Sequence, residues 1–500
     1  MLNKIITFEV AIGTMNNLDN ISVVWFKRDL RLHDNEAIFN ALQTKEPLLL
    51  VYIFEPSLHE DAHYSERHWD FIKQSLLDLN HKLSNCNTKV LTVESEVIPF
   101  FSFLLSHYNI KSVFSHQETG IDKTYVRDKT FRRFCRNNSI QWIENVNNGV
   151  FRGRNTEGNW SDKWLQYMKA PQLDFLPEKE HRFLHFSEIA NLEGNLIIKN
   201  LETKDSKVLQ KGGVETAKEY FRSFFKERYI NYAKYTASSA LGRESYSRLS
   251  PYLAWGNLSV REVFQEAQKR KQEIANKLPM DMFVSRLKWQ AHFIQKFETD
   301  NIMTEEKVSL GHNKLKKQLS IKYTIAWQEG KTGYPMIDAS MRCLKETGYL
   351  NFKMRAMVVS FFTHNLWQPW QEASSFLSRL FLDFEPGIHL PQTQIQAAIS
   401  DTKTIKNFNP TKIGLEYDPM GEFIVQWVPE LKNLPVDFRH EPYKMSFIEQ
   451  KLYNFNLGKD YPEPVVDIRS TKKRVSDVIW DVKDSNKPKQ NKSFNNRLNN

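Results

Sequence analysis

The sequence predicts an α/β protein: an N-terminal parallel-sheet domain of the Rossmann type, followed by an all-helical domain. Strand-like apolar runs alternate with segments of helical spacing through residues 20–150. Residues 151–210 have little periodicity and many charges, which is typical of an interdomain connector. Helical periods then follow one another over residues 211–470, and residues 471–500 have the polar, basic composition of a disordered tail.

Each element of the first domain is predicted from its own apolar pattern. The five strands are expected at Ile21–Phe26, Pro47–Phe54, Lys89–Val93, Ser112–His116 and Gln141–Asn145. The helices between them are expected at Glu36–Leu42, Arg67–Leu83, Val97–Tyr108 and Asp122–Asn138. A helix between successive strands is the usual crossover that makes neighbouring strands parallel.

The second domain is predicted from amphipathic segments that begin at Lys211–Phe225. Val260–Ile274 and Met354–Trp367 show the same helical period. Apolar residues are 41% of the 500, which suffices for two or three domains. Aromatic residues are 13%, with 34 Phe and 12 Trp, and fit either a large helical core or a site that stacks a chromophore or a base.

Charge and cysteine content restrict the functional classes. The net charge of +10 permits binding to nucleic acid by phosphate neutralisation. Cys86, Cys135 and Cys343 are too few for an all-cysteine iron–sulfur site or a disulfide framework, and we expect no metal. They indicate a reducing, cytoplasmic location. No run of 18 apolar residues predicts a membrane span, and residues 1–14 fit an extended start better than a signal peptide.

The segment Tyr246–Ser259 contains a motif suited to phosphate. Ser250 precedes Pro251, a pair that commonly starts a helix because the serine caps free N–H groups and proline suits the first turn. Helix N-termini also attract phosphate groups. The residues alone leave two interpretations, a capped helix without a ligand or a phosphate cradle.

Several longer motifs resemble the photolyase/cryptochrome family over residues 20–470. They are VVWFKRDLRLHDNEAI (Val23–Ile38), YSRLSPYLAWGNLS (Tyr246–Ser259), RLKWQAHF (Arg286–Phe293), WQEGKTGYPMIDASMR (Trp327–Arg342) and FNPTKIGLEYDPMGEFIVQWVPEL (Phe408–Leu431). The resemblance implies an α/β domain that could carry an antenna chromophore of unidentified type. It also implies a helical domain that binds FAD in a central pocket opening on a basic surface.

The resemblance also implies which residues hold FAD. Ser247, Leu249 and Ser250 match the segment that lines the FAD pyrophosphate, with Tyr235 or Tyr232 as the preceding tyrosine. Arg355 would pair with Asp383 beside the flavin ring, and Glu385 is the second acid of that motif. His389 falls where the family places the residue facing flavin N5, and a histidine there could donate a proton near neutral pH. The alternatives are an Arg–Asp pair that only joins two helices and a structural histidine.

The substrate pocket departs from the family pattern. Trp289 matches the tryptophan that stacks on a pyrimidine dimer. The family's glutamate, asparagine and methionine are replaced by Arg286, Phe352 and Ala356, and a second tryptophan is absent from Gln392–Ala398. Arg286 could stabilise a dimer radical anion, hold a DNA phosphate or pair with a local carboxylate.

The tryptophan relay that photoreduces flavin in the family is also altered. Trp370 aligns with its middle member, whereas the proximal position falls near Thr393 or Gln394 and the distal one near Lys317. Trp367 or Trp327 could offer another route. All three tryptophans could equally be core aromatics.

The leading hypothesis is a monomeric, FAD-dependent photolyase that splits pyrimidine dimers in damaged DNA, single-stranded DNA included, under blue light. The runner-up is a cryptochrome-like photoreceptor without repair activity, whose signalling partner the sequence does not identify. A third class is a single-strand nucleic-acid binder that keeps FAD for its structure. Light-dependent repair of a defined lesion separates the first two, and the third predicts binding that is indifferent to lesions and to light.

Overall fold

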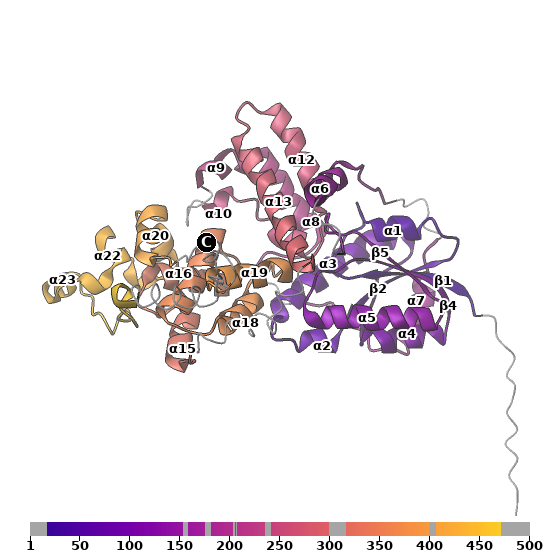
Figure 1. The fold of residues 1–500 in the computed structure, drawn as a ribbon, viewed down its shortest axis with the longest axis horizontal. Coiled ribbons are helices and arrows are strands. Elements are labelled where there is room, and N and C mark those ends of the chain that lie inside the picture. Colours follow the sequence, from indigo (N-terminus) through magenta and orange to yellow (C-terminus); the bar gives the residue numbers. More distant parts are fainter. Residues whose placement is uncertain are drawn as a thin grey trace, which may run out of the picture.

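A computed structural model describes residues 18–153, 159–175, 182–203, 206, 208–235, 242–299, 317–399 and 407–471. The predicted extended start and nearly all of the predicted tail lie outside these ranges. The ribbon shows a sheet domain at one end of an elongated molecule and a helical domain at the other (Figure 1).

The sheet domain contains five parallel strands in the order β3-β2-β1-β4-β5 among the described residues. The strands are β1 (Asn20–Phe26), β2 (Leu48–Phe54), β3 (Leu91–Glu94), β4 (Asn109–His116) and β5 (Gln141–Asn145). β1 lies in the middle, and its Val24 pairs with Leu50 of β2 and Phe114 of β4. The predicted Rossmann-like fold is therefore confirmed.

Helices cover both faces of this sheet, because the central strands are apolar on both sides. Trp25 and Val51 face a cluster that includes Phe101 and Phe131 from one helical layer. That layer consists of α4 (Val97–Leu105), α5 (Asp122–Asn137) and α7 (Phe186–Glu193), and the opposite layer includes α1 (Glu36–Ala41), the short α2 (Pro56–His59) and α3 (Glu66–Leu83). The expected helix boundaries agree within a few residues, and α4 ends three residues early because Ser106 already caps it.

The helical domain begins after the connector, which itself contains α6 (Trp160–Lys169) and α7. The first helices are α8 (Val214–Lys226), α9 (Tyr232–Tyr235), α10 (Gly242–Ser245), α11 (Ser250–Ala254), α12 (Val260–Glu273) and α13 (Leu278–Thr299). There follow α15 (Ile321–Glu329), α16 (Pro335–Thr347), α17 (Phe352–Ser360), α18 (Trp370–Leu380) and α19 (Pro386–Gln396). The last are α20 (Pro410–Tyr417), α21 (Glu422–Trp427), α22 (Val436–His440) and α23 (Phe447–Leu452).

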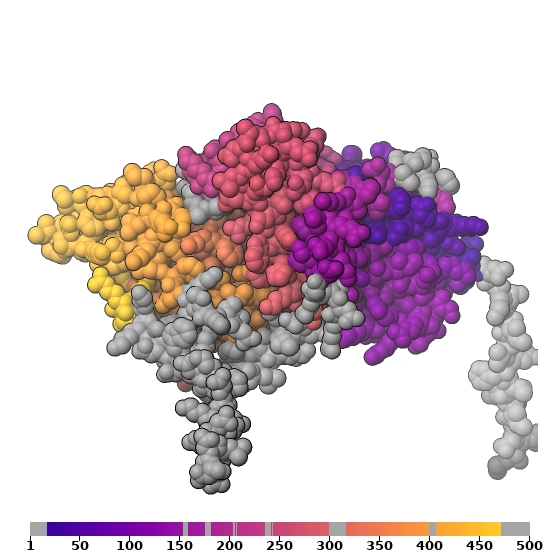
Figure 2. Space-filling model, turned by 45° about the horizontal axis from the view of Figure 1, so that its top comes forward, coloured from indigo at the N-terminus to yellow at the C-terminus, as the bar shows by residue number. Residues whose placement is uncertain are grey.

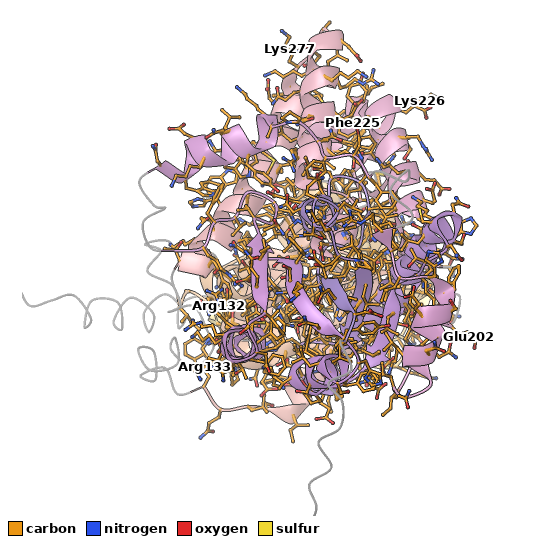
Figure 3. The ribbon with its side chains drawn as sticks, turned by 90° about the vertical axis from the view of Figure 1, so that its right-hand side faces the viewer. Arg132, Arg133, Glu202, Phe225, Lys226 and Lys277 are labelled. Carbon is orange, nitrogen blue, oxygen red and sulfur yellow. The ribbon has the colours of Figure 1, made fainter. Side chains whose placement is uncertain are left out.

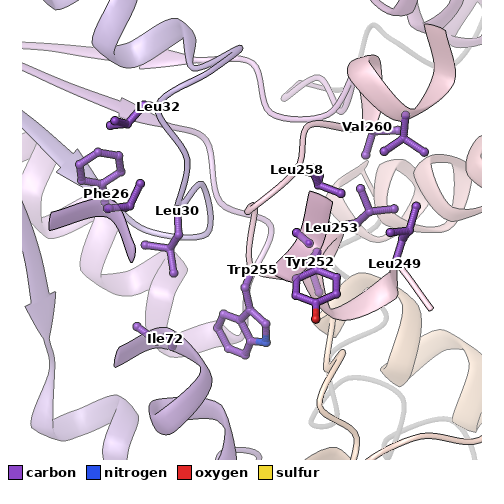
Figure 4. Close-up of a cluster of buried hydrophobic side chains, with 14 of the residues drawn as sticks. Phe26, Leu30, Leu32, Ile72, Leu249, Tyr252, Leu253, Trp255, Leu258 and Val260 are labelled. Atoms are coloured by element: carbon purple, nitrogen blue, oxygen red, sulfur yellow. The ribbon is translucent and has the colours of Figure 1, made fainter. Parts of the chain in front are cut away.

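One hydrophobic cluster joins the two domains. Phe26, Leu30 and Ile72 of the sheet domain belong to the same buried cluster as Tyr252 and Trp255 of the helical domain (Figure 4). Gly256 permits this close approach, because a Cβ there would lie 2.3 Å from the Arg28 carbonyl oxygen, and its φ is +78°. The domains are therefore packed together through a shared core.

Charged side chains lie at the outer surface of both domains. Arg132 and Arg133 lie at the rim of the sheet domain, and Lys226 and Lys277 lie near the tip of the helical domain (Figure 3). The region of α12 and α13 projects from the surface between the two ends of the molecule (Figure 2). Among the described residues, no helix combines the length and apolar character needed to cross a membrane.

Candidate cofactor site and substrate-facing surface

Arg355 and Asp383 form the predicted pair. Arg355, on α17, donates from Nη1 to Asp383 Oδ1 at 3.0 Å and from Nη2 to Oδ2 at 2.8 Å. Burial alone would raise the pKa of Asp383, but the charge and hydrogen bonds of Arg355 outweigh it and hold this pKa below its usual value. Asp383 is therefore an anion at neutral pH, and Arg355 is held in a planar, two-pronged contact.

Two aromatic rings contact the same guanidinium. The Arg355 Cζ atom lies 4.0 Å from the centre of the Phe381 ring and 5.6 Å from that of Tyr349. The side chain of Asp383 is only 7% exposed, whereas that of Arg355 is 28% exposed. The pair thus has a buried anionic end and a partly open cationic end. Sequence reasoning did not assign Tyr349 and Phe381, because ring contacts across helices leave no local pattern.

The predicted phosphate segment reaches this pair through Ser250. Its hydroxyl hydrogen-bonds the Asp383 carboxylate and so helps lower the pKa of Asp383. Leu249 is buried, and the Ser247 Oγ accepts a 3.4 Å bond from its N–H. Tyr235 is partly exposed at the end of α9, whereas Tyr232 packs against Phe224 and Phe283 in the core. This burial favours Tyr235 as the tyrosine available to a ligand.

Glu385 and His389 are held by other groups. The Glu385 carboxylate lies 3.6 Å from Arg28 of the sheet domain, so it faces the domain interface. Burial lowers the pKa of His389 to about 3, so its ring is neutral near neutral pH. Its Nε2 lies 2.9 Å from the Ser374 carbonyl oxygen and must carry the single ring proton as donor. His389 is thus no ready proton donor in this arrangement.

The residues around α19 suit a polar cofactor. Four buried polar atoms there have no hydrogen-bond partner in the structure: Ser374 Oγ, Gln396 Oε1, His364 Nδ1 and Asn365 Oδ1. Such atoms are costly to bury unless a ligand or water satisfies them. His364 and Asn365 lie in a π-helical turn, Phe361–Asn365, a feature common at functional sites. The donors and acceptors of FAD would fit this set.

The residues predicted to face a substrate lie on the exposed side of α13. Trp289 is 53% exposed, and His292 packs edge-on against it at 5.5 Å. Arg286, one turn earlier, is exposed and places its guanidinium 5.9 Å from the Phe352 ring of α17. No carboxylate pairs with Arg286 among the described residues, so a local ion pair, one of its three predicted roles, is not found there. The two replaced positions, Arg286 and Phe352, therefore contact each other.

The three relay candidates differ in their surroundings. Trp327 is fully buried against Phe362 and Phe376, and its Nε1 donates to the Val358 carbonyl oxygen at 3.1 Å. Trp370 is buried at the start of α18, and Trp367 is partly exposed with Lys317 over its ring. Trp327 thus has the contacts expected of a core aromatic.

The carboxyl edge of the sheet is where ligands of α/β domains usually bind, at the switch between β1 and β4. Here Arg127 fills the crevice and bonds Glu55 at 2.7 Å, Glu118 at 2.6 Å and Asp128 at 2.9 Å. The remaining cavity, whose lining includes Arg127, Glu55, Glu118, Trp25 and Arg28, has about 30 Å³. Ligand pockets measure roughly 300–1,000 Å³. A second chromophore does not fit this crevice as its side chains stand.

Comparison with known proteins agrees with both halves of the structure. A family model described as DNA photolyase matches residues 22–158, and one described as FAD binding domain of DNA photolyase matches residues 283–481. The first lies on the sheet domain and the second on the helical domain, and together they cover more than half of the chain.

Individual relatives match nearly end to end. A cryptochrome DASH from Synechocystis sp. is 27% identical over 91% of this chain and 97% of its own length. A deoxyribodipyrimidine photo-lyase from Alkalihalophilus pseudofirmus is 25% identical over 92% of this chain and 98% of its own. The crystal structure of the Synechocystis cryptochrome has the same fold, with a TM-score of 0.83 at 23% identity over 93% of this chain and 100% of that one. On the two family models and these full-length matches, the chain belongs to the photolyase/cryptochrome family.

Proposed function

We propose that the protein is an FAD-dependent, blue-light-driven DNA photolyase that splits UV-induced pyrimidine dimers. The observation that carries the proposal is the arrangement of α13 and α17. Phe352 and Arg355 are three residues apart on α17 and so lie on one side of it. Phe352 contacts Arg286 of the exposed α13 face, and Arg355 holds Asp383. One helix thus connects the substrate-facing surface with the proposed cofactor pair.

In this proposal, Ser247, Leu249, Ser250 and Tyr235 bind the FAD phosphates, and Arg355 and Asp383 flank its ring. When bound, reduced FAD supplies a light-excited electron that opens the dimer and returns afterwards. The guanidinium of Arg355 favours the anionic, reduced form of the ring by its charge. The crevice at the sheet edge, as its side chains stand, is too small for an antenna chromophore.

The surface residues bind and orient the substrate. The half-exposed ring of Trp289 offers a stacking face for an extruded base, a contact worth about 1–3 kcal/mol. Arg286 brings a positive charge to the same face, where it stabilises negative charge on the dimer or holds a phosphate. Phe352, 52% exposed, supplies apolar surface in place of a hydrogen-bonding amide. The partner is therefore damaged DNA with the lesion turned out of the helix.

A second candidate is a cryptochrome-like photoreceptor that binds FAD and lacks repair activity. The contact between Arg286 and Phe352 favours it, because neither residue offers the acceptor pattern expected for a dimer. The relatives include both a cryptochrome DASH and a photo-lyase. Repair activity decides between the two.

The test is repair of a thymine-dimer oligonucleotide, single-stranded and duplex, by FAD-loaded protein under blue light with a reductant. Dark samples and undamaged DNA are the controls. Trp289→Ala should weaken binding to the lesion by about 5- to 150-fold, corresponding to about 1–3 kcal/mol. Phe447→Ala, which removes a 70% exposed ring from the distant α23, should not.

Light-dependent loss of the dimer would establish the photolyase. Absence of loss, with FAD bound and reduced, would favour the photoreceptor. Equal affinity of the wild type for damaged and undamaged DNA, unchanged in Trp289→Ala, would remove the stacking role of Trp289.

A further inference from the structure

The backbone around Asp383 accepts hydrogen bonds from side chains that belong to distant parts of the chain. The segment Arg379–Glu385 joins α18 to α19. Its carbonyl oxygens accept bonds from five side chains: Ser65 to Arg379 at 2.6 Å, Arg67 to Leu380 at 2.8 Å, His68 to Phe381 at 2.9 Å, Trp255 to Leu382 at 2.9 Å and Arg28 to Phe384. We call these five donors the carbonyl clamp.

The clamp supplies hydrogen-bond donors to carbonyl oxygens at the C-terminal end of α18. The last carbonyls of a helix have no partner within the helix and usually turn to water or to a capping residue. Here Ser65, the N-cap of α3, and Arg67 and His68 of its first turn donate to three consecutive carbonyls. Four of the five donors come from the sheet domain, although Asp383 belongs to the helical domain. The position of Asp383 therefore depends on how the two domains pack.

His68 has its proton fixed by its surroundings. Its Nδ1 accepts the Ser65 N–H at 3.2 Å, so its Nε2 must carry the proton that bonds the Phe381 carbonyl oxygen. The ring is fully buried, and burial lowers the pKa of His68 to about 4, which keeps it neutral. This histidine is a rigid, uncharged donor to the carbonyl of Phe381, which lies two residues before Asp383.

Arg28 acts on the other side of Asp383. It is buried, donates from Nη2 to the Phe384 carbonyl oxygen and from Nε to the Ala254 carbonyl oxygen at 3.0 Å. Its guanidinium lies 4.3 Å from the centre of the Trp255 ring and 3.6 Å from the Glu385 carboxylate. A planar guanidinium with these contacts has little freedom to move.

We propose that His68 and Arg28 are positioning residues for the Arg355–Asp383 pair. By holding the carbonyls of Phe381 and Phe384 they fix the backbone on both sides of Asp383, and so the direction of its carboxylate and of the guanidinium bound to it. The proposal rests on the placement of FAD at that pair. A shift of such a pair by a fraction of an ångström alters both the affinity for a bound ring and the charge it experiences.

The experiment compares His68→Leu, which removes the donor, with His68→Gln, whose amide N–H can still reach the Phe381 carbonyl oxygen. Ile189→Ala is the control, because Ile189 is buried in the other cluster of the sheet domain and is not one of the five donors. Three quantities are measured on each protein: the melting temperature without FAD, the Kd for FAD, and the midpoint potential of the bound flavin.

His68→Leu should weaken FAD binding about tenfold and move the flavin potential to a more negative value, because the positive charge of Arg355 is less well placed. His68→Gln should restore both quantities. Ile189→Ala should lower the melting temperature and leave the flavin potential unchanged. Arg28→Lys, which keeps the charge and loses the forked contacts, should move both quantities in the same direction as His68→Leu, and it replaces that variant if His68→Leu does not fold.

A lower melting temperature of His68→Leu with unchanged Kd and potential would overturn the proposal and leave the clamp a purely structural device. The proposal would also be overturned if the changes in FAD binding free energy caused by His68→Leu and Asp383→Ala were additive in the double variant. Substitutions of residues that act through one another do not have additive effects. Failure of the FAD placement itself would look different, since Asp383→Ala alone would then retain FAD.

Discussion

Removal of the Asp383 carboxylate is the most direct test of the cofactor site. Asp383→Ala leaves Arg355 without two charge-assisted bonds of 3.0 and 2.8 Å and deprives Ser250 of its partner. Loss of one partner of a buried pair costs about 3–5 kcal/mol. Because Arg355 is 28% exposed and can regain some hydration, we expect Asp383→Ala to lower the free energy of unfolding of the FAD-free protein by about 3 kcal/mol. Asp383→Asn keeps the shape and one acceptor and should cost about half as much.

FAD affinity provides the second quantity. A hydrogen bond to a charged group contributes about 1.5–3 kcal/mol, so loss of one contact to FAD should raise its Kd by roughly 10- to 150-fold. Urea unfolding of the FAD-free protein measures the free energy of unfolding, and titration with FAD measures the Kd. Glu430→Ala is the matched control, because it breaks the 2.8 Å pair with Arg342 in the same domain, among residues not assigned to FAD. It should change stability slightly and FAD affinity not at all.

The pH dependence supplies an independent check. The pKa of Asp383 is depressed in the folded protein, so the pair contributes its full stability above the ordinary aspartate value of 3.8 and loses it as the pH falls further. Asp383→Ala should therefore remove part of the acid sensitivity of unfolding. If Asp383→Ala kept the wild-type FAD affinity and lost stability at low pH as the wild type does, the assignment of this pair to the cofactor would be refuted.

Three further predictions concern other residues of the site. Burial raises the pKa of Glu385 to about 7, so its neutral form stabilises the fold fully below the ordinary glutamate value of 4.5, and this stability is lost as the pH rises through about 7. Glu385→Gln should therefore flatten the dependence of melting temperature on pH in this range, and an unchanged slope would assign that dependence to other groups. Trp370→Phe should slow light-driven flavin reduction at least tenfold, whereas Trp327→Phe should mainly lower the melting temperature; equal rates in Trp370→Phe and the wild type would exclude Trp370 from the relay. Arg286→Glu should weaken DNA binding and reduce the slope of log Kd against log salt by about 1 if Arg286 contacts a phosphate, and an unchanged slope would favour a contact with the base.

The strands and longer helices of the sheet domain could be predicted to within a few residues, whereas the short α2 was not predicted. Gln141–Asn145 was expected as a strand and is one, and Ser112–His116 is a strand that starts three residues earlier, at Asn109. A strand that is apolar on both faces is stable only when helices cover both faces of its sheet. Such apolar runs therefore predict a parallel sheet between two helical layers. Segment 151–210 was harder, because α6 and α7 are short and are held by packing against α12 and the sheet rather than by their own periodicity.

The pairing of Arg355 with Asp383 was expected from the family resemblance, and the structure places these two side chains together. The orientation of Glu385 toward Arg28, the contact between Arg286 and Phe352, and the filled crevice around Arg127 were not foreseen. Each of these depends on side chains that are far apart in the chain. A linear pattern records which residue is present and not which distant group it meets.

The sequence by itself determined the order of the elements, the two-domain plan and the family, because periodicity and motif spacing are local properties of the chain. The tertiary structure alone decided what holds Asp383 in place. Ser65, Arg67, His68 and Arg28 lie more than 300 residues from the carbonyls they bond. Such contacts form only when the sheet domain packs on the helical domain, since the open carbonyls at the end of α18 then meet donors instead of water.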